Sequence, residues 1–323
     1  MSALTALFIG GNGIISSAVS RLAIERGVDL TLLNRGTESK RPPIEGARHI
    51  TGDADNLPAL GDYDVVVNFR SFLPSAVESD VARFTGRTGQ YVYISSASAY
   101  QKPVARLPIT ESTPLRNDFW QYSRDKIASE DVLVAAYRSA GFPATIVRPS
   151  HTYDRTAIVL EGGWTQLDRM RRGEPIVVHG DGTSLWTLTH NTDFALAFVG
   201  LLGNKRAIGE AYTITSDEAL PWDAIARLYG DALGVNPEIV HVASETIARA
   251  IPEWGPGLLG DKAHSVVFDN AKVKALVPEY SATMPFWKGA RETVEWHLEQ
   301  ADRQTVDAAL NSQLDALISA ARS

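Results

Sequence analysis

The sequence predicts an α/β protein built on a doubly wound parallel sheet with a smaller C-terminal lobe. Over the first 150 residues, short β-rich runs alternate with helical patterns, as expected for a parallel sheet. A glycine cluster lies between the first of these runs and the first helical pattern. After Ser150 the regular alternation ends, and glycine, proline and tryptophan residues are interspersed among further helical patterns.

The elements of the first half follow from local periodicity. Val65, Val66 and Val67 do not alternate with polar residues, which indicates a strand covered on both faces. Apolar residues between 15 and 23 recur on one helical face, and that pattern ends at Gly27. We expect six strands, at residues 4–9, 28–33, 49–51, 64–68, 90–95 and 144–147.

Helical periodicity continues through the second half. It predicts helices at 122–140, 191–202, 222–233 and 286–299. In the tail from Ala301, Val306, Leu310, Leu314 and Leu317 follow 4-4-3 spacing, which predicts a closing amphipathic helix packed on its own domain.

Composition excludes several classes of function. The 323 residues are 44% hydrophobic and carry a net charge of −7, which argues against a large nucleic-acid-binding surface. The absence of cysteine excludes disulfides, thiolate metal sites and a cysteine nucleophile. The sequence also contains no grouping of histidines with carboxylates of the kind that binds a metal ion. No apolar run reaches the roughly 18 residues of a membrane span, and the N-terminus is interpreted as a strand and not as a signal peptide. We therefore expect a cytoplasmic protein with no membrane or nucleic-acid partner.

The glycine cluster predicts a dinucleotide-binding loop. Glycine permits a tight turn that brings backbone N–H groups to a pyrophosphate at a helix N-terminus. Ser16 replaces the third glycine of the usual fingerprint and is small enough to keep the helix close to the strand. The expected contacts are Gly10, Gly11, Asn12, Gly13 and Ile14.

Residues after the second and third strands bear on the choice of cofactor. NAD-preferring sites offer a carboxylate to the ribose 2′-hydroxyl, whereas this chain has Asn34 followed by the cation Arg35. Arg35 could pair with a 2′-phosphate, so NADP is preferred and NAD is the alternative. Asp53, followed by Ala54, is placed to accept a hydrogen bond from the adenine amino group, or it caps a turn.

A tyrosine and a lysine carry the predicted chemistry. Tyr122 and Lys126 lie at i and i+4 on one helical face. A neighbouring ammonium favours the ionised phenol, so we expect the pKa of Tyr122 to fall toward neutrality. The serine-rich strand end before this helix supplies a hydroxyl that can polarise a substrate carbonyl.

Together, these motifs resemble the extended short-chain dehydrogenase/reductase superfamily, in its NAD-dependent epimerase/dehydratase branch. The resemblance implies a Rossmann-like NAD(P)-binding domain over 1–150, rejoined by about 187–215, and a mainly substrate-binding lobe over 151–323. It maps the catalytic residues onto Ser96, Tyr122 and Lys126. Relatives often dimerise through helices corresponding to 74–85 and 123–140, so a homodimer is expected. Further cofactor contacts are expected at Asn68, Phe69, Arg70, Ile94, Pro149 and Ser150.

The sequence departs from the family where the substrate is recognised. Trp186 stands where nucleotide-sugar enzymes carry an arginine for the diphosphate, so we expect a smaller, less charged substrate. Trp186 and Trp164 either line its pocket or pack in the core. His151 either binds the substrate or acts as a second acid/base, or it is a polar residue at a strand end. Phe72 and Ser98 are the remaining candidate substrate contacts.

These observations predict an NAD(P)-dependent oxidoreductase. It would transfer a hydride reversibly at a carbinol or carbonyl carbon of a small, sugar-like substrate, in a reduction, an epimerisation or a dehydration. The alternative is a non-catalytic NAD(P)-binding sensor or an RNA-associated protein of the same superfamily. A broken Tyr/Lys/Ser set or a strongly basic chain would favour the alternative, and this sequence has neither.

Overall fold

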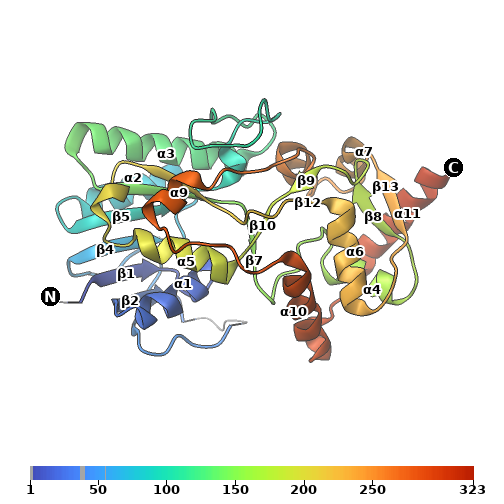
Figure 1. Ribbon diagram of the computed structural model, residues 1–323, viewed down its shortest axis with the longest axis horizontal. Helices are drawn as coiled ribbons and strands as arrows, with labels where there is room; N and C mark the ends of the chain where they lie inside the picture. Colours follow the sequence, from blue (N-terminus) through green and yellow to red (C-terminus); the bar gives the residue numbers. More distant parts are fainter. Residues whose placement is uncertain (1–2, 37–40, 55) are drawn as a thin grey trace.

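The computed structural model describes residues 3–36, 41–54 and 56–323. A large sheet with helices on both faces forms one end of the molecule, and a smaller lobe of helices and short strands forms the other (Figure 1). The first strand lies in the large sheet, and the last helix lies in the small lobe (Figure 1). The predicted doubly wound fold is confirmed.

The large sheet has seven parallel strands in the order β11-β6-β5-β4-β1-β2-β3. All six expected strands are present, and a seventh, β11, joins from the second half of the chain. The strands of this sheet are β1 (Thr5–Ile9), β2 (Asp29–Asn34), β3 (Arg48–Thr51), β4 (Tyr63–Asn68), β5 (Thr88–Ile94), β6 (Ala144–Pro149) and β11 (Ala211–Ile214).

Helices cover both faces of this sheet. On one face lie α1 (Ile14–Glu25) and α5 (Asn191–Leu201), and on the other lie α2 (Pro74–Phe84) and α3 (Gln121–Ala140). Val65 and Val67 belong to the core beneath α1 and α5, whereas Val66 belongs to the core beneath α2 and α3. This placement explains the unbroken valine run, because successive strand residues point to opposite faces and both faces are buried. The homodimer expected through α2 and α3 stays a prediction.

The small lobe is assembled from shorter elements around separate cores. Its strands, among the described residues, pair in twos: β7 (His151–Tyr153) with β10 (Leu188–His190), β8 (Ile176–His179) with β13 (Ile239–Val242), and β9 (Leu185–Trp186) with β12 (Leu220–Pro221). The helices of this lobe are α4 (Trp164–Arg171), α6 (Trp222–Leu233), α7 (Ser244–Ala250), α8 (Gly255–Gly257), α10 (Phe286–Leu298) and α11 (Ala308–Arg322). Helix α9 (Ala271–Leu276) instead packs on α5 and β11 at the large-sheet end of the molecule (Figure 1).

One helix boundary differs from the expectation. The tail helix begins after Asp307, whose carboxylate accepts hydrogen bonds from the backbone N–H groups of Ala309 and Leu310. Val306 therefore lies outside α11 and is 40% exposed, so its assignment to the apolar stripe was wrong. Among the described residues, no helix has both the length and the apolar character that crossing a membrane requires.

Candidate active site and cofactor cleft

The glycine loop links β1 to α1 at the carboxyl edge of the sheet. Gly10 has φ +89°, in the left-handed region that favours glycine. A Cβ atom at Gly10 would lie 2.6 Å from Cγ of Arg70, so a larger residue would also collide with the cleft wall. The Gly13 N–H donates to Oγ of Ser16 over 2.7 Å, so the serine at the third glycine position caps the loop.

A cleft of about 870 Å³ opens above this loop. The described residues that line it include most of the predicted cofactor contacts: Gly10, Asn12, Gly13, Ile14, Asn34, Arg35, Asp53, Ala54, Phe69, Arg70, Ile94, Tyr122, Lys126, Pro149 and Ser150. Its size and its position at the N-terminus of α1 suit an extended phosphate-bearing ligand.

Two predicted cofactor residues do not line the cleft. A Cβ atom at Gly11 would lie 2.5 Å from Leu32 Cδ2, so Gly11 allows the loop to pack on β2. Asn68 is buried, and its Nδ2 donates to Asp80 Oδ2 over 2.7 Å. Its Oδ1 accepts the Arg70 N–H over 2.8 Å. Asn68 therefore shapes the turn that presents Phe69 and Arg70. The expected contacts of Gly11 and Asn68 with the cofactor stay a prediction.

The cleft contains an unsatisfied donor at the predicted residue Asn34 and a cation, Arg41, that the sequence analysis did not predict. The buried Nδ2 atom of Asn34 has no hydrogen-bond partner among the described residues, which fits a site completed by a ligand acceptor. Arg41 also lines the cleft, and its Nε donates to Asp154 Oδ2 over 2.5 Å. The sequence analysis did not predict Arg41, because its partner Asp154 lies far away in the second half of the chain.

Lys126 is held beside the cleft by two backbone carbonyls. Its Nζ donates to the carbonyl oxygens of Ile94, over 2.7 Å, and Ser71, over 3.0 Å. It lies 5.7 Å from the ring centroid of Tyr122. Burial lowers the pKa of Lys126 to about 7, although the negative charge of Glu130 opposes this shift. Lys126 can therefore gain and lose its proton much closer to neutral pH than an exposed lysine can.

The pKa of Tyr122 differs from the expectation. It is raised above its ordinary value of 10.0, because burial outweighs the opposing hydrogen bond with Ser96, and Asp261 adds a further increase. The expectation of a lowered pKa considered the neighbouring lysine and omitted the loss of solvent. In the protein without ligand, Tyr122 is therefore a neutral phenol, a state suited to donating a proton.

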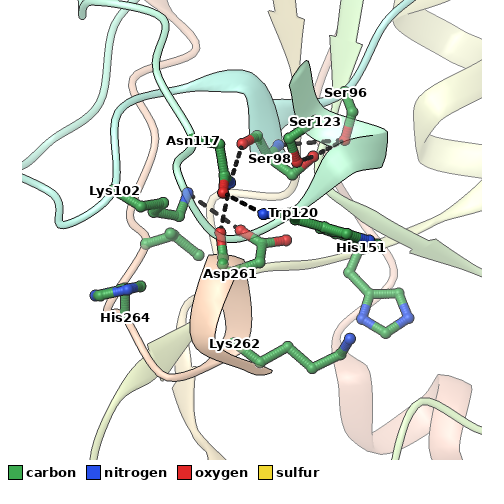
Figure 2. A network of polar contacts seen from close by, with 12 residues as sticks. Ser96, Ser98, Lys102, Asn117, Trp120, Ser123, His151, Asp261, Lys262 and His264 are labelled. Atoms are coloured by element: carbon green, nitrogen blue, oxygen red, sulfur yellow. Dashed lines mark hydrogen bonds and ion pairs between the residues drawn. The ribbon is translucent and has the colours of Figure 1, made fainter. Parts of the chain in front are cut away.

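The hydroxyls of Ser123, Ser98 and Ser96 form a chain (Figure 2), and Ser96 is hydrogen-bonded to the phenol of Tyr122. Ser123 Oγ donates to Ser98 Oγ over 2.8 Å, and the hydroxyls of Ser98 and Ser96 lie 2.9 Å apart. The Ser98 N–H also donates to Ser96 Oγ, over 3.2 Å. The consistent direction is from Ser123 through Ser98 to Ser96, which leaves the Ser96 proton for Tyr122 or a substrate oxygen.

A second pocket of about 270 Å³ shares Ser96 and Tyr122 with the cleft. Ser98, His151 and Trp186 line it, as the sequence analysis predicted for substrate contacts. Phe72 lines the cofactor cleft instead, because the turn after Asn68 directs it there.

Trp164 belongs to the core of the small lobe and lines neither cavity among the described residues. It is 5% exposed and stacks on His297 with ring centroids 5.4 Å apart. The core interpretation of Trp164 is therefore the right one, and its assignment to the substrate pocket was wrong.

His151 is neutral and accepts a hydrogen bond from Trp186 at the substrate pocket. The Trp186 Nε1–H donates to its Nδ1 atom over 3.1 Å. Burial, with a smaller contribution from the charge of Lys262, lowers the pKa of His151 to about 3, so the ring is neutral near pH 7. Because Nδ1 accepts, the proton of the neutral ring lies on Nε2.

The pocket also contains residues that sequence reasoning missed. Asp261 and Lys262 line it from a π-helical turn over Leu258–Lys262. Asn117 connects this turn to the catalytic serines, because its Nδ2 donates to the carbonyl oxygens of Gly260, over 2.7 Å, and Ser98, over 3.0 Å (Figure 2). No local motif marks these residues, since their partners lie far away in the chain.

Comparison with known proteins supports the assignment of fold and family. Residues 6–215 match the model of the NAD dependent epimerase/dehydratase family. A UDP-N-acetylglucosamine 4-epimerase from Methanobrevibacter ruminantium M1 superposes with a TM-score of 0.74 at 16% identity, over 93% of this chain and all of the epimerase. A dTDP-glucose 4,6-dehydratase from Bacillus anthracis superposes with a TM-score of 0.73 at 18% identity, over 93% of this chain and 98% of that protein.

Two curated proteins are similar in sequence. The chloroplast stem-loop binding protein of 41 kDa b from Arabidopsis thaliana is 29% identical over 73% of this chain, and the match spans 65% of that protein. The 2′-dehydrokanamycin reductase from Streptomyces kanamyceticus is 28% identical over 86% of this chain and 80% of the reductase. With the family model matching well over half of its length, the chain belongs to the NAD dependent epimerase/dehydratase family and has a Rossmann-like fold.

Proposed function

We propose that this protein is a reductase or dehydrogenase that acts on the carbonyl or carbinol carbon of a small, sugar-like substrate without a nucleotide diphosphate. The observation that carries the proposal is the convergence of Tyr122, Lys126 and Ser96 where the cofactor cleft meets the 270 Å³ pocket. That pocket is below the usual range of roughly 300–1,000 Å³ for drug-sized ligands, which favours a single ring over a nucleotide sugar. The similarity to a protein named as a reductase favours a reduction over an epimerisation or a dehydration.

The three residues divide the work on the substrate oxygen. A bound nicotinamide dinucleotide supplies the hydride chemistry. The neutral phenol of Tyr122 donates a proton to the carbonyl oxygen, and Ser96 donates a hydrogen bond to the same oxygen. The ammonium of Lys126 stabilises the resulting phenolate, because an opposite charge nearby favours the ionised form.

Replacing Tyr122 tests the catalytic proposal. Tyr122→Phe should lower kcat about 1000-fold, because it removes the proton donor while the ring keeps its packing. Dissociation constants for NADPH and NADH, measured by tryptophan quenching, should change less than about twofold, a difference of roughly 0.4 kcal/mol. Undiminished turnover in the variant would contradict the assignment of Tyr122.

We also propose a preference for NADP, carried by Arg35. Arg35 lines the cleft just after β2. The strand ends in the neutral Asn34, where an NAD-preferring site would have a carboxylate. Arg35→Ala should weaken NADPH binding about tenfold and leave NADH binding unchanged, because only NADPH has the 2′-phosphate. Arg106→Ala, at an exposed position outside the cleft, is the matched control. Equal affinity of the wild type for both cofactors would contradict the preference.

RNA association is a second candidate function, because the Arabidopsis relative is named a stem-loop binding protein. The net charge of −7 argues against it. Titration of a stem-loop RNA at low and high salt decides between the two. Tight binding to the RNA together with no turnover of any carbonyl substrate would favour the second candidate.

A further inference from the structure

Two ion pairs meet at the substrate pocket, and together they cancel its charge. Oδ1 of Asp261 lies 3.1 Å from Nζ of Lys102, whose side chain is fully buried. Nζ of Lys262 lies 2.7 Å from Oε1 of Glu161. Asp261 and Lys262 are the charged side chains among the described residues that line the pocket. Among the described residues, the pocket lining therefore offers neither a cation free to pair with a phosphate nor an anion free to pair with an amine.

The polar groups that remain suit hydroxyl groups. The second carboxylate oxygen of Asp261 is directed away from Lys102 (Figure 2). A carboxylate oxygen can accept more than one hydrogen bond, and a sugar hydroxyl can supply one. On the same lining, the Nε2–H of neutral His151 is a donor. The indoles of Trp120 and Trp186 add flat apolar surface of the kind that packs against the faces of a ring.

We propose that the pocket binds an uncharged, polyhydroxylated ring and that Asp261 is the acceptor that determines this specificity. The inference rests on the proposed function and narrows its substrate class. A phosphate group on the ring would find no unpaired cation among the described residues of the pocket lining. An ammonium group would add a positive charge beside the carboxylate of Asp261, which Lys102 already neutralises. A hydroxyl exchanges a hydrogen bond with water for one with Asp261 and brings no charge into the pocket.

A panel of matched rings tests this inference. With NADP⁺ present, we would measure NADPH formation and ligand-induced tryptophan quenching for glucose, galactose and myo-inositol. The same measurements on glucose 6-phosphate, glucosamine and UDP-glucose provide the charged counterparts. We expect at least one uncharged ring to bind, and its kcat/KM or affinity to exceed that of the charged rings by about tenfold or more. Preference for a charged ring, or no binding of any uncharged ring, would overturn the inference.

A double variant tests the role of Asp261 without leaving a buried charge unpaired. Lys102→Met combined with Asp261→Asn should weaken the best uncharged ring about tenfold through KM and leave the NADPH dissociation constant unchanged. The matched control is Lys274→Met with Asp217→Asn, which removes a partly exposed ion pair of 2.7 Å that lines neither cavity. Equal KM values in the two double variants would overturn the inference. Failure of the wild type to bind NADPH would instead overturn the proposed function.

Discussion

Burial determines the protonation of the catalytic side chains more strongly than their spacing does. Tyr122 and Lys126 lie one helical turn apart, as their i, i+4 positions require, yet burial raises the pKa of the phenol and lowers that of the ammonium. Both shifts favour the neutral form, because each group has lost solvent. The neighbouring charge modifies this effect without reversing it.

The shifted pKa of Lys126 predicts a pH-dependent stability difference. The folded-state pKa is about 7, below the ordinary 10.5, so between these values the unfolded chain binds a proton that the folded chain lacks. The free energy of unfolding should therefore rise with pH between these two pKa values. Below about pH 7 the folded protein bears the full cost of burying the charged ammonium, and above the ordinary pKa of 10.5 that cost is absent. Urea unfolding of the wild type and Lys126→Met measures the difference, which should grow in favour of the wild type from about pH 7 to about pH 10. Parallel stability curves for the two proteins would contradict the shift.

At the scale of elements, Asn117 joins three segments that build the pocket. Its Nδ2 binds the serine-bearing turn after β5 and the π-helical turn, and its Oδ1 accepts the N–H of Trp120, over 3.0 Å, at the start of α3. A Cβ atom at Gly260 would lie 2.9 Å from Cβ of Trp120, so the π-helical turn is in close contact with the start of α3. One buried amide thereby sets the positions of Ser98, Asp261 and Tyr122 relative to one another.

Removing this amide should affect both stability and turnover. Asn117→Ala leaves buried carbonyl and N–H groups without partners, and we expect a loss of about 2 kcal/mol in the free energy of unfolding. It should lower kcat more than NADPH affinity, because the cofactor cleft does not include Asn117 among its described lining residues.

Urea unfolding and steady-state kinetics measure the two effects. Asn204→Ala, which removes the cap of a short surface turn, is the matched control and should cost about 1 kcal/mol or less with no change in turnover. Wild-type kcat in Asn117→Ala would contradict the positioning role.

At the scale of the whole molecule, the cofactor cleft and the distal core of the small lobe are separate. Leu314, Leu317 and Ile318 of α11 pack with Val177 and Val242 in a cluster that shares no described residue with the cleft. The two can therefore respond differently to substitution.

This separation predicts a loss of stability without a loss of cofactor binding. Leu314 is fully buried, so Leu314→Ala should cost about 3 kcal/mol of unfolding free energy by leaving a cavity. The NADPH dissociation constant at ambient temperature should stay at its wild-type value. Leu298→Ala, at a position 43% exposed, is the control and should change stability by less than about 0.5 kcal/mol. A weakened NADPH affinity in Leu314→Ala would show that the cleft depends on this distal core.

By itself, the sequence determined the strands of the first half, the helices that begin near Ile15 and Tyr122, the loop at Gly10 and the pairing of Tyr122 with Lys126. These features depend on neighbours a few residues apart, so periodicity and spacing are sufficient to predict them. The tertiary structure alone decided that Asn68 and Trp164 are packing residues, that His151 is neutral and that Lys102 reaches Asp261. Burial and ion pairing depend on which distant segments surround a side chain, and no local pattern in a chain encodes that arrangement.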